Sequence, residues 1–201
     1  EFQKKHGLEL RVGTEPEMMW LTKNPDGSPT GSGFSKPYCY HIDQFESLRP
    51  VFMKVIEYAS AMGLDMIQGD HEDAPGQLEL NWMYDDVLRN ADRLSTYRQI
   101  CAQVAREFNL IACFMTKPFM GVSASGCHTN MSLWTGGKDK VNKLSHKSIP
   151  AMDEVFTYVE GGKNTFMPDT KDVQLPGKVG LKAIGGVMKH LGALTAIGSS
   201  T

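Results

Sequence analysis

Apolar and polar positions along the chain predict a series of strands and helices. Residues 8–21 alternate and then become apolar, which predicts one long strand, and the Asn, Pro, Asp and Gly of residues 24–29 predict a turn after it. Asp43 and Glu46 have the spacing of a capping box. The helical spacing of the apolar residues that follow predicts one amphipathic helix over residues 43–62.

The clearest predicted element is a helix from Val87 to Phe108, because its apolar residues repeat along one helical face. Short apolar runs predict strands at 64–68, 77–82 and 110–115, and another from Cys127 after a small-residue loop at 121–126. In the last third we expect a polar turn at 136–140 and helices over 151–159 and 179–197, the second interrupted at Gly185-Gly186. Strands and helices do not alternate regularly, so the pattern favours an α+β fold.

Composition fits a globular domain with a sizeable core. The 201 residues are 41% hydrophobic and 22% charged. The net charge of -2 comes from 21 basic and 23 acidic residues that are mixed along the chain, so no basic block indicates a nucleic-acid partner.

The chain carries no signal for a membrane or for secretion. Its longest apolar runs are far shorter than the roughly 20 residues of a membrane helix, and no secretory signal pattern opens it. We therefore expect a cytoplasmic protein without a membrane partner. The 4 cysteines form no Cys-x-x-Cys pair, which favours reduced thiols. The chain begins at Glu1 and ends at Thr201 after a helical stretch, so we expect it to be part of something longer.

Candidate chemistry lies in carboxylates and one imidazole. Glu15 and Glu17 alternate on a predicted strand and so share a face, while Glu72 and Glu79 flank the bend at residues 75–76. Carboxylates are the ligands that Mg²⁺ prefers, and an added imidazole such as His128 also suits Mn²⁺. Four glutamates and one histidine could therefore hold more than one ion.

The strand from Cys127 has the same alternation. His128, Asn130 and Ser132 share one face, and we expect the residues between them to face the core. A lone Glu-x-Glu pair or a lone histidine is more often a solvated or structural feature than a ligand. The combination and order of these motifs carry more weight than any one of them.

Four motifs in order resemble the catalytic domain of the glutamine synthetase family. They are Gly-x-Glu-x-Glu at 13–17, His-Glu-x-Ala-x-Gly-Gln-x-Glu at 71–79, Phe-Met-x-Lys-Pro at 114–118 and Ser-Gly-x-His-x-Asn-x-Ser-Leu at 125–133. The resemblance implies a curved antiparallel sheet with packing helices. Residues 1–201 would be a portion of such a catalytic domain, with the N-terminal domain and the C-terminal part of the catalytic domain outside them. The family's active site is completed by the neighbouring subunit of a homo-oligomeric ring.

The resemblance also implies residue roles. Two or more Mg²⁺ or Mn²⁺ ions would be held by Glu15, Glu17, Glu72, Glu79 and His128. In the family's arrangement Glu17, Glu72 and Glu79 would serve one ion, and Glu15 with His128 the other. Asn130 and Ser132 match positions that contact ATP, and the glutamate-binding segment corresponds to Ser123, Ala124, Gly126 and His128.

The implied reaction is an ATP-dependent ligation of glutamate to an amine. ATP would phosphorylate the γ-carboxylate, and the amine would attack the γ-glutamyl phosphate and release phosphate. The site has to neutralise and align two anions, so no side-chain nucleophile is needed. Ammonia is the expected acceptor, methylamine the alternative and a polyamine the more distant one.

Some residues depart from the common family pattern. Ser123-Ala124 stands where many members have Asn-Gly, and Ile67 stands where many have a glutamate that contacts nucleotide. The sequences Asp-His-Glu-Asp at 70–73 and Gly-Cys-His-Thr at 126–129 resemble more closely the branch that includes γ-glutamylmethylamide synthetases. Two other classes stay open: an inactive structural or regulatory homologue, and a guanidino or amino-acid binding module outside the family.

Overall fold

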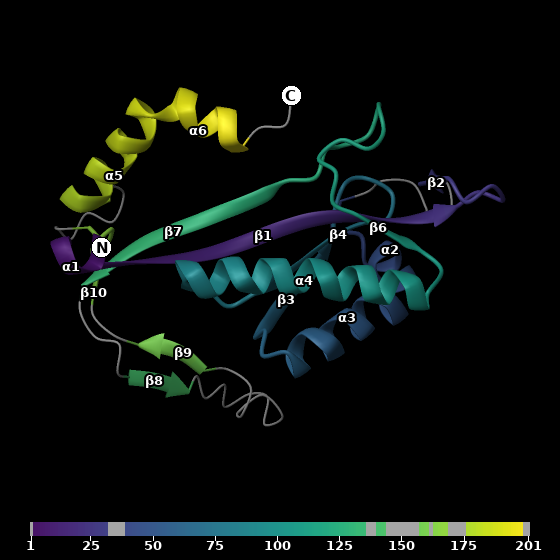
Figure 1. Cartoon of the computed structure of the whole chain (residues 1–201), viewed down its shortest axis with the longest axis horizontal. Helices are drawn as coiled ribbons and strands as arrows, with labels where there is room; N and C mark the ends of the chain where they lie inside the picture. Colours follow the sequence, from purple (N-terminus) through teal and green to yellow (C-terminus); the bar gives the residue numbers. More distant parts are fainter. Residues whose placement is uncertain are drawn as a thin grey trace. The chain divides into compact units, whose positions relative to one another are not determined.

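The structure is a computed structural model that describes residues 2–31, 39–135, 140–143, 157–160, 163–168 and 176–198 (Figure 1). The chain divides into two compact units. One comprises residues 1–11, 131–142 and 159–201, and the other comprises residues 12–130 and 143–158. The candidate metal ligands all lie in the second unit.

The helices are α1 (Phe2–His6), α2 (Ile42–Ser47), α3 (Arg49–Ala61), α4 (Val87–Glu107), α5 (Lys178–Lys189) and α6 (Leu191–Gly198). The strands are β1 (Leu8–Lys23), β2 (Pro29–Thr30), β3 (Met66–His71), β4 (Gln77–Trp82), β5 (Asp85–Asp86), β6 (Ile111–Cys113), β7 (Cys127–Thr135), β8 (Lys140–Lys143), β9 (Thr157–Glu160) and β10 (Lys163–Asn164). The open, largely antiparallel sheet with packing helices confirms the expected α+β class.

Strand β1 is central to the sheet, whose order is β10-β7-β1-β4-β3. It pairs antiparallel with β4 and continues into a hairpin with β2, which confirms the predicted long strand and the turn. Strand β4 has the predicted bounds and pairs antiparallel with β3 on its other side.

Alternation in β4 separates the core from the polar face. Leu78 and Leu80 are 0% and 1% exposed and belong to the main apolar cluster. That cluster also contains Val55 of α3 and Val104 of α4, so the two helices cover this face of the sheet (Figure 1). Complete burial of one such side chain stabilises the fold by about 1.5–3 kcal/mol. The intervening residues Gln77, Glu79 and Asn81 are polar and project to the opposite face.

The single helix predicted over residues 43–62 is wrong in its first turns. Two helices, α2 and α3, meet at Leu48, and His41 occupies the N-cap of α2 without a side-chain cap bond. The Asp43–Glu46 spacing therefore makes no capping box. Pro50 lies in the first turn of α3, where its missing N–H leaves no helical bond unmade.

Helix α4 confirms the prediction of a long packing helix, but its apolar face is shifted. Val87 and Leu88 are 45% and 64% exposed, whereas Asn90 and Tyr97 are buried. Asn90 is buried because its Oδ1 accepts a hydrogen bond of 2.9 Å from the indole of Trp82. A residue-type pattern cannot anticipate such a pair.

Predictions for the last third are corrected in two places. Residues 157–160 form β9, so the end of the helix expected over 151–159 is wrong; Thr157, Tyr158 and Val159 are residue types that favour strands. The final helical stretch breaks at His190, between α5 and α6, and continues through Gly185-Gly186. The remaining residues of the first helix, 151–156, and residues 136–139 of the polar turn lie outside the described part.

Three further expectations can be compared with the structure. All four cysteines are free, with Cys101 and Cys113 buried and Cys39 and Cys127 exposed. Among the described helices, none combines the length and apolar character that crossing a membrane requires. The expectation of a core on the second face of β7 is not met at Met131, which is 52% exposed, because no described part of the chain covers it.

Candidate active site

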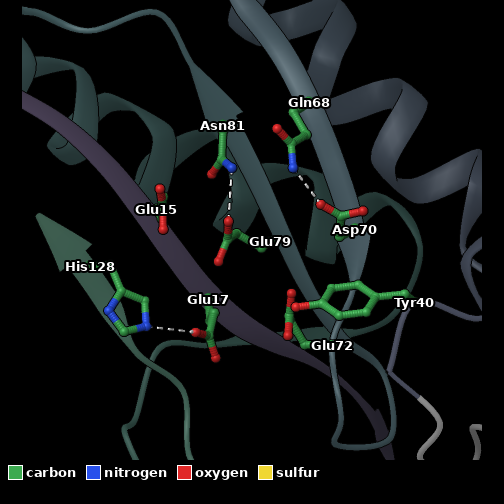
Figure 2. A pocket seen from close by; sticks show the side chains of 9 residues that line it. All are labelled: Glu15, Glu17, Tyr40, Gln68, Asp70, Glu72, Glu79, Asn81 and His128. Carbon is green, nitrogen blue, oxygen red and sulfur yellow. Dashed lines mark hydrogen bonds and ion pairs between the residues drawn. The ribbon is translucent and has the colours of Figure 1, made fainter. Parts of the chain in front are cut away.

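A polar cavity of about 410 Å³ lies on the sheet face opposite the helices. Strands β1, β3, β4 and β7 and the segments beside them supply its lining (Figure 2). The lining residues are Glu15, Glu17, Tyr40, Gln68, Asp70, Glu72, Glu79, Asn81 and His128. The structure therefore brings all five candidate metal ligands to one cavity.

Strand register arranges the acids across the sheet. Glu17 lies opposite Glu79 in the β1–β4 pair, and Asp70 lies opposite Glu79 in the β3–β4 pair. We call these three residues the acidic row. Amides beside it donate to its carboxylates: Asn81 Nδ2 lies 2.8 Å from Glu79 Oε1, and Gln68 Nε2 lies 2.7 Å from Asp70 Oδ2.

Three contacts hold Glu17. Its backbone N–H donates to the carbonyl of Gly126 at 3.0 Å, and its Oε2 accepts from Gln77 Nε2 at 3.1 Å. Its Oε1 lies 3.7 Å from His128 Nε2 (Figure 2). A Cβ at Gly126 would lie only 2.9 Å from that Oε1 atom and 3.1 Å from the His128 nitrogen. Glycine is therefore needed at position 126 for the observed approach of these side chains.

Glu15 and Glu72 are held by different segments. Glu15 Oε1 accepts a bond of 2.6 Å from Asn130 Nδ2, so β7 contacts both acids of β1. Glu72 lies just after β3, where its N–H donates to the carbonyl of Gln77 at 2.8 Å. Its Oε2 accepts from the Cys39 thiol at 3.6 Å.

Burial and neighbouring acids raise the pKa values of Glu79 and Glu72. Burial raises the pKa of Glu79, and the nearby Glu15 and Glu17 raise it further against the lowering effect of the Asn81 bond. Burial likewise raises the pKa of Glu72, with Glu17 and Glu79 adding to it. Ionised forms of these groups are disfavoured without a cation.

The donor set fits a hard divalent cation, since it consists of several carboxylates and one imidazole in a polar cavity. Their positions are spread rather than gathered on one point. Within the described residues, no group of three His, Cys, Asp or Glu side chains already stands close enough to hold one ion. Side-chain rotation toward a bound ion would be needed.

Of the residues expected to contact glutamate or ATP, Ser123, Ala124, Asn130 and Ser132 do not line the cavity, and each makes contacts within the protein. Ser123 Oγ donates to a carboxylate oxygen of Asp73, and the carbonyl of Ala124 accepts from Gln77 Nε2 at 3.1 Å. Asn130 is engaged with Glu15, as described above. Ser132 belongs to the other unit, where its hydroxyl accepts from the Trp134 indole at 2.8 Å.

Sequence reasoning did not select four of the lining residues: Tyr40, Gln68, Asp70 and Asn81. Strand alternation was an available signal for Asn81, which lies two residues after Glu79 on the same face. It was also available for Gln68, the last residue of the strand predicted at 64–68, but Asp70 lies beyond that predicted strand and within the observed β3. Tyr40 has no comparable signal, because its position depends on a left-handed backbone with φ of 60° and on its N–H bond to the His71 carbonyl.

Comparison with known families identifies the fold and its lineage. The family described as "Glutamine synthetase, catalytic domain" matches residues 1–162. The chain belongs to the glutamine synthetase family. The resemblance drawn from the four motifs is thereby confirmed.

Relatives in this family carry two kinds of name. A glutamine synthetase of Rhizobium meliloti (strain 1021) is 32% identical over 200 residues, which are 98% of this chain and 40% of that protein. A glutamate–methylamine ligase of Methyloversatilis universalis is 33% identical over 159 residues, which are 78% of this chain and 36% of that protein. The chain thus spans about two fifths of the length of the curated relatives it matches.

Solved structures agree with the fold. A structure described as "GmaS/ADP complex-Conformation 1" has a TM-score of 0.74 and 30% identity, over 96% of this chain and 39% of that one. The Plasmodium falciparum glutamine synthetase has a TM-score of 0.75 at 21% identity, over 100% of this chain and 40% of that one, which shows the common fold.

Proposed function

We propose that the full-length protein is an ATP-dependent glutamate–amine ligase that forms a γ-glutamyl amide through γ-glutamyl phosphate. The observation that carries the proposal is the cavity in which Glu15, Glu17, Glu72, Glu79 and His128 come together. Membership of the glutamine synthetase family supports the same reaction. The glutamate–methylamine ligase and the ADP complex among the relatives support an amine acceptor and a nucleotide substrate.

The residues can be given roles in this reaction. Glu17, Glu72 and Glu79 would hold one Mg²⁺ or Mn²⁺ ion, and Glu15 with His128 would hold another. Such ions would neutralise the phosphates of ATP and the γ-carboxylate of glutamate, two anions that otherwise repel.

The protein's own part is positioning, because the acids are fixed by Asn81, Gln77 and Asn130 before substrates arrive. Asn130 and Ser132 would contact ATP. Ser123, Ala124, Gly126 and His128 would lie at the glutamate. A homo-oligomeric ring would complete the site with residues of a neighbouring subunit.

Ammonia is the proposed acceptor, which makes the protein a glutamine synthetase. Methylamine is the alternative acceptor. Two observations support it: the 33% identity to a glutamate–methylamine ligase and the residue order Asp70-His71-Glu72-Asp73. The residues that choose the amine are expected outside residues 1–201. A comparison of kcat/KM for the two amines therefore decides between them.

The test is phosphate release by the full-length protein with ATP, Mg²⁺ and glutamate, titrated with ammonium or methylammonium. The proposal expects release only when an amine is present, and a higher kcat/KM for ammonium. A higher kcat/KM for methylammonium would establish the alternative. Release without any amine would contradict ligase chemistry.

A matched pair of variants links activity to the cavity. Glu79→Gln removes a carboxylate from the acidic row and should lower kcat/KM by 10-fold or more, on the order of a lost metal ligand. Glu57→Gln makes the same change on α3, where Glu57 pairs with Lys54 at 2.7 Å on the surface. That control should retain activity.

A further inference from the structure

Gln77 is a buried amide at the junction of three segments. It lies on β4, opposite Met19 of β1, and is 1% exposed. Its polar atoms reach Glu17, the bend after β3 and the loop before β7. It does not line the cavity itself.

The contacts of Gln77 divide into a donor side and an acceptor side. Its Nε2 lies 3.1 Å from Glu17 Oε2, 3.1 Å from the Ala124 carbonyl and 3.1 Å from Ser125 Oγ. Its Oε1 accepts from the backbone N–H of Ala74 at 2.9 Å. An amide nitrogen carries two hydrogens, so these acceptors share them.

This geometry makes the amide a link between a carboxylate and a loop. Glu17 Oε2 is oriented by Gln77 while Oε1 stays free to face His128 and the cavity. The same hydrogens fix the carbonyl of Ala124 and the hydroxyl of Ser125, whose segment continues into Gly126. A cation that draws Glu17 would therefore change how the hydrogens are shared with the loop.

We propose that Gln77 is a positioning residue that couples the Glu17 carboxylate to the Ala124–Gly126 segment, so that divalent-metal affinity and glutamate affinity depend on one amide. The inference rests on the proposed function, since it takes Glu17 as a metal ligand and this segment as the glutamate contact. Gln77 does not line the cavity, so we assign it no direct contact with substrate or metal. It acts through the two groups it holds.

The test measures Mn²⁺ binding to the full-length protein by calorimetry, with and without saturating glutamate. Gln77→Met keeps the length and volume of the side chain but removes both donors and the acceptor. We expect Mn²⁺ affinity to fall 10–100-fold, the usual effect of losing a partner of a metal ligand. We also expect the change in Mn²⁺ affinity caused by glutamate to shrink toward none, because the amide that joins Glu17 to the loop is gone. The effect of Mn²⁺ on glutamate affinity must shrink by the same factor.

Controls separate positioning from folding. Gln103→Met makes the same substitution on α4, where Gln103 Nε2 donates to Glu107 at 2.9 Å on the surface, and it should change neither measurement. In a Glu17→Gln background, Gln77→Met should add little further loss of Mn²⁺ affinity, since both act on one carboxylate. Lowered thermal stability with unchanged Mn²⁺ affinity and unchanged coupling would overturn the inference.

A second variant serves if Gln77→Met does not fold. Ser125→Ala removes one loop acceptor and leaves the Glu17 contact in place, so Mn²⁺ affinity without glutamate should stay within about 3-fold while the glutamate effect weakens. An unchanged glutamate effect would count against the coupling.

The Glu17→Gln variant distinguishes failure of this inference from failure of the proposed function. Equal Mn²⁺ binding by wild type and Glu17→Gln would contradict the proposed function itself. A loss of Mn²⁺ affinity in Glu17→Gln with no loss in Gln77→Met would contradict this inference alone.

Discussion

Glu17 and Glu79 lie directly opposite one another on the antiparallel strands β1 and β4. Like charges at directly opposite positions destabilise a sheet, and Asp70 on β3 extends the repulsion to a third strand. The neighbouring amides Asn81 and Gln68 each relieve one carboxylate. The remaining charge is a reason for the acidic row to bind cations.

The first prediction concerns the stability of the metal-free protein. Burial and neighbouring acids raise the pKa of Glu79 above its ordinary value of 4.5, so the folded state binds more protons than the unfolded state in the range above 4.5. Stability must then fall as pH rises through that range. We therefore measure the melting temperatures of wild type and Glu79→Gln in EDTA. The wild-type value minus the Glu79→Gln value should decrease from pH 5 to pH 7.

The same comparison tests the role of the cation. Saturating Mg²⁺ should remove most of this pH dependence, because the cation offsets the charge of the ionised acids. Buried His71, whose pKa burial lowers, titrates with the opposite sign, but it is common to both proteins and cancels in the difference. A wild type that gains stability over Glu79→Gln as pH rises in EDTA would contradict the prediction.

The second prediction separates the two faces of β4. Glu79→Gln should lower turnover and metal affinity, and at any one pH it should change the melting temperature much less than a core substitution does. Leu80→Ala, one residue away and 1% exposed, should destabilise the fold by about 2–5 kcal/mol and leave metal affinity intact below its melting temperature. Thermal melts and Mn²⁺ titrations of both variants check this. Matching losses in both measurements would argue against a functional face.

The third prediction uses the close approach at Gly126. A methyl group in Gly126→Ala would meet Glu17 Oε1 at 2.9 Å and His128 Nε2 at 3.1 Å. Both atoms are the ends of side chains, so they should move away and weaken Mn²⁺ binding with little effect on melting. Gly185→Ala in α5 meets nothing within 4 Å and should instead stabilise its helix by about 0.8–1.0 kcal/mol. Unchanged Mn²⁺ affinity in Gly126→Ala would show that this approach is unimportant.

Strand alternation was the most reliable guide from sequence to structure. It correctly placed Glu15 with Glu17 on one face of β1, and the motif around Glu72 and Glu79 located the bend between β3 and β4. These predictions succeed because a strand's side chains are fixed by a period of two residues. The family resemblance added the expectation that these separate segments contribute to one site.

Long-range pairs could not be read from the sequence. Asp70 joins the acidic row only through the register of β3 against β4, and Tyr40 lines the cavity only through its left-handed backbone. The break between α2 and α3 arises at Leu48, which is 1% exposed in the core, so tertiary packing outweighs the helical pattern there. Arg93 of α4 is a charged residue, yet its side chain is largely buried and pairs with Asp65 and Asp85.

The last prediction concerns those contacts of Arg93. Its guanidinium lies 3.3 Å from Asp65 Oδ2 and 3.4 Å from Asp85 Oδ2, and its side chain is 13% exposed. It also donates to the carbonyls of Gly63 and Met83 at 3.3 Å each. Arg93 thus connects α4 with the segments that lead into β3 and out of β4.

Removal of the Arg93 guanidinium should destabilise the fold without altering the acidic cavity. Burial raises the pKa of Asp65 and Arg93 opposes that rise, so Arg93→Met leaves a largely buried carboxylate without its partner. Losing one member of a buried ion pair costs about 3–5 kcal/mol, and we expect the lower end because Arg89 still pairs with Asp85 at 3.2 Å. Urea unfolding gives the free energy, and the double variant Arg93→Met with Asp65→Asn should recover part of the loss. A loss of Mn²⁺ affinity in folded Arg93→Met would show instead that this ion-pair network supports the acidic cavity.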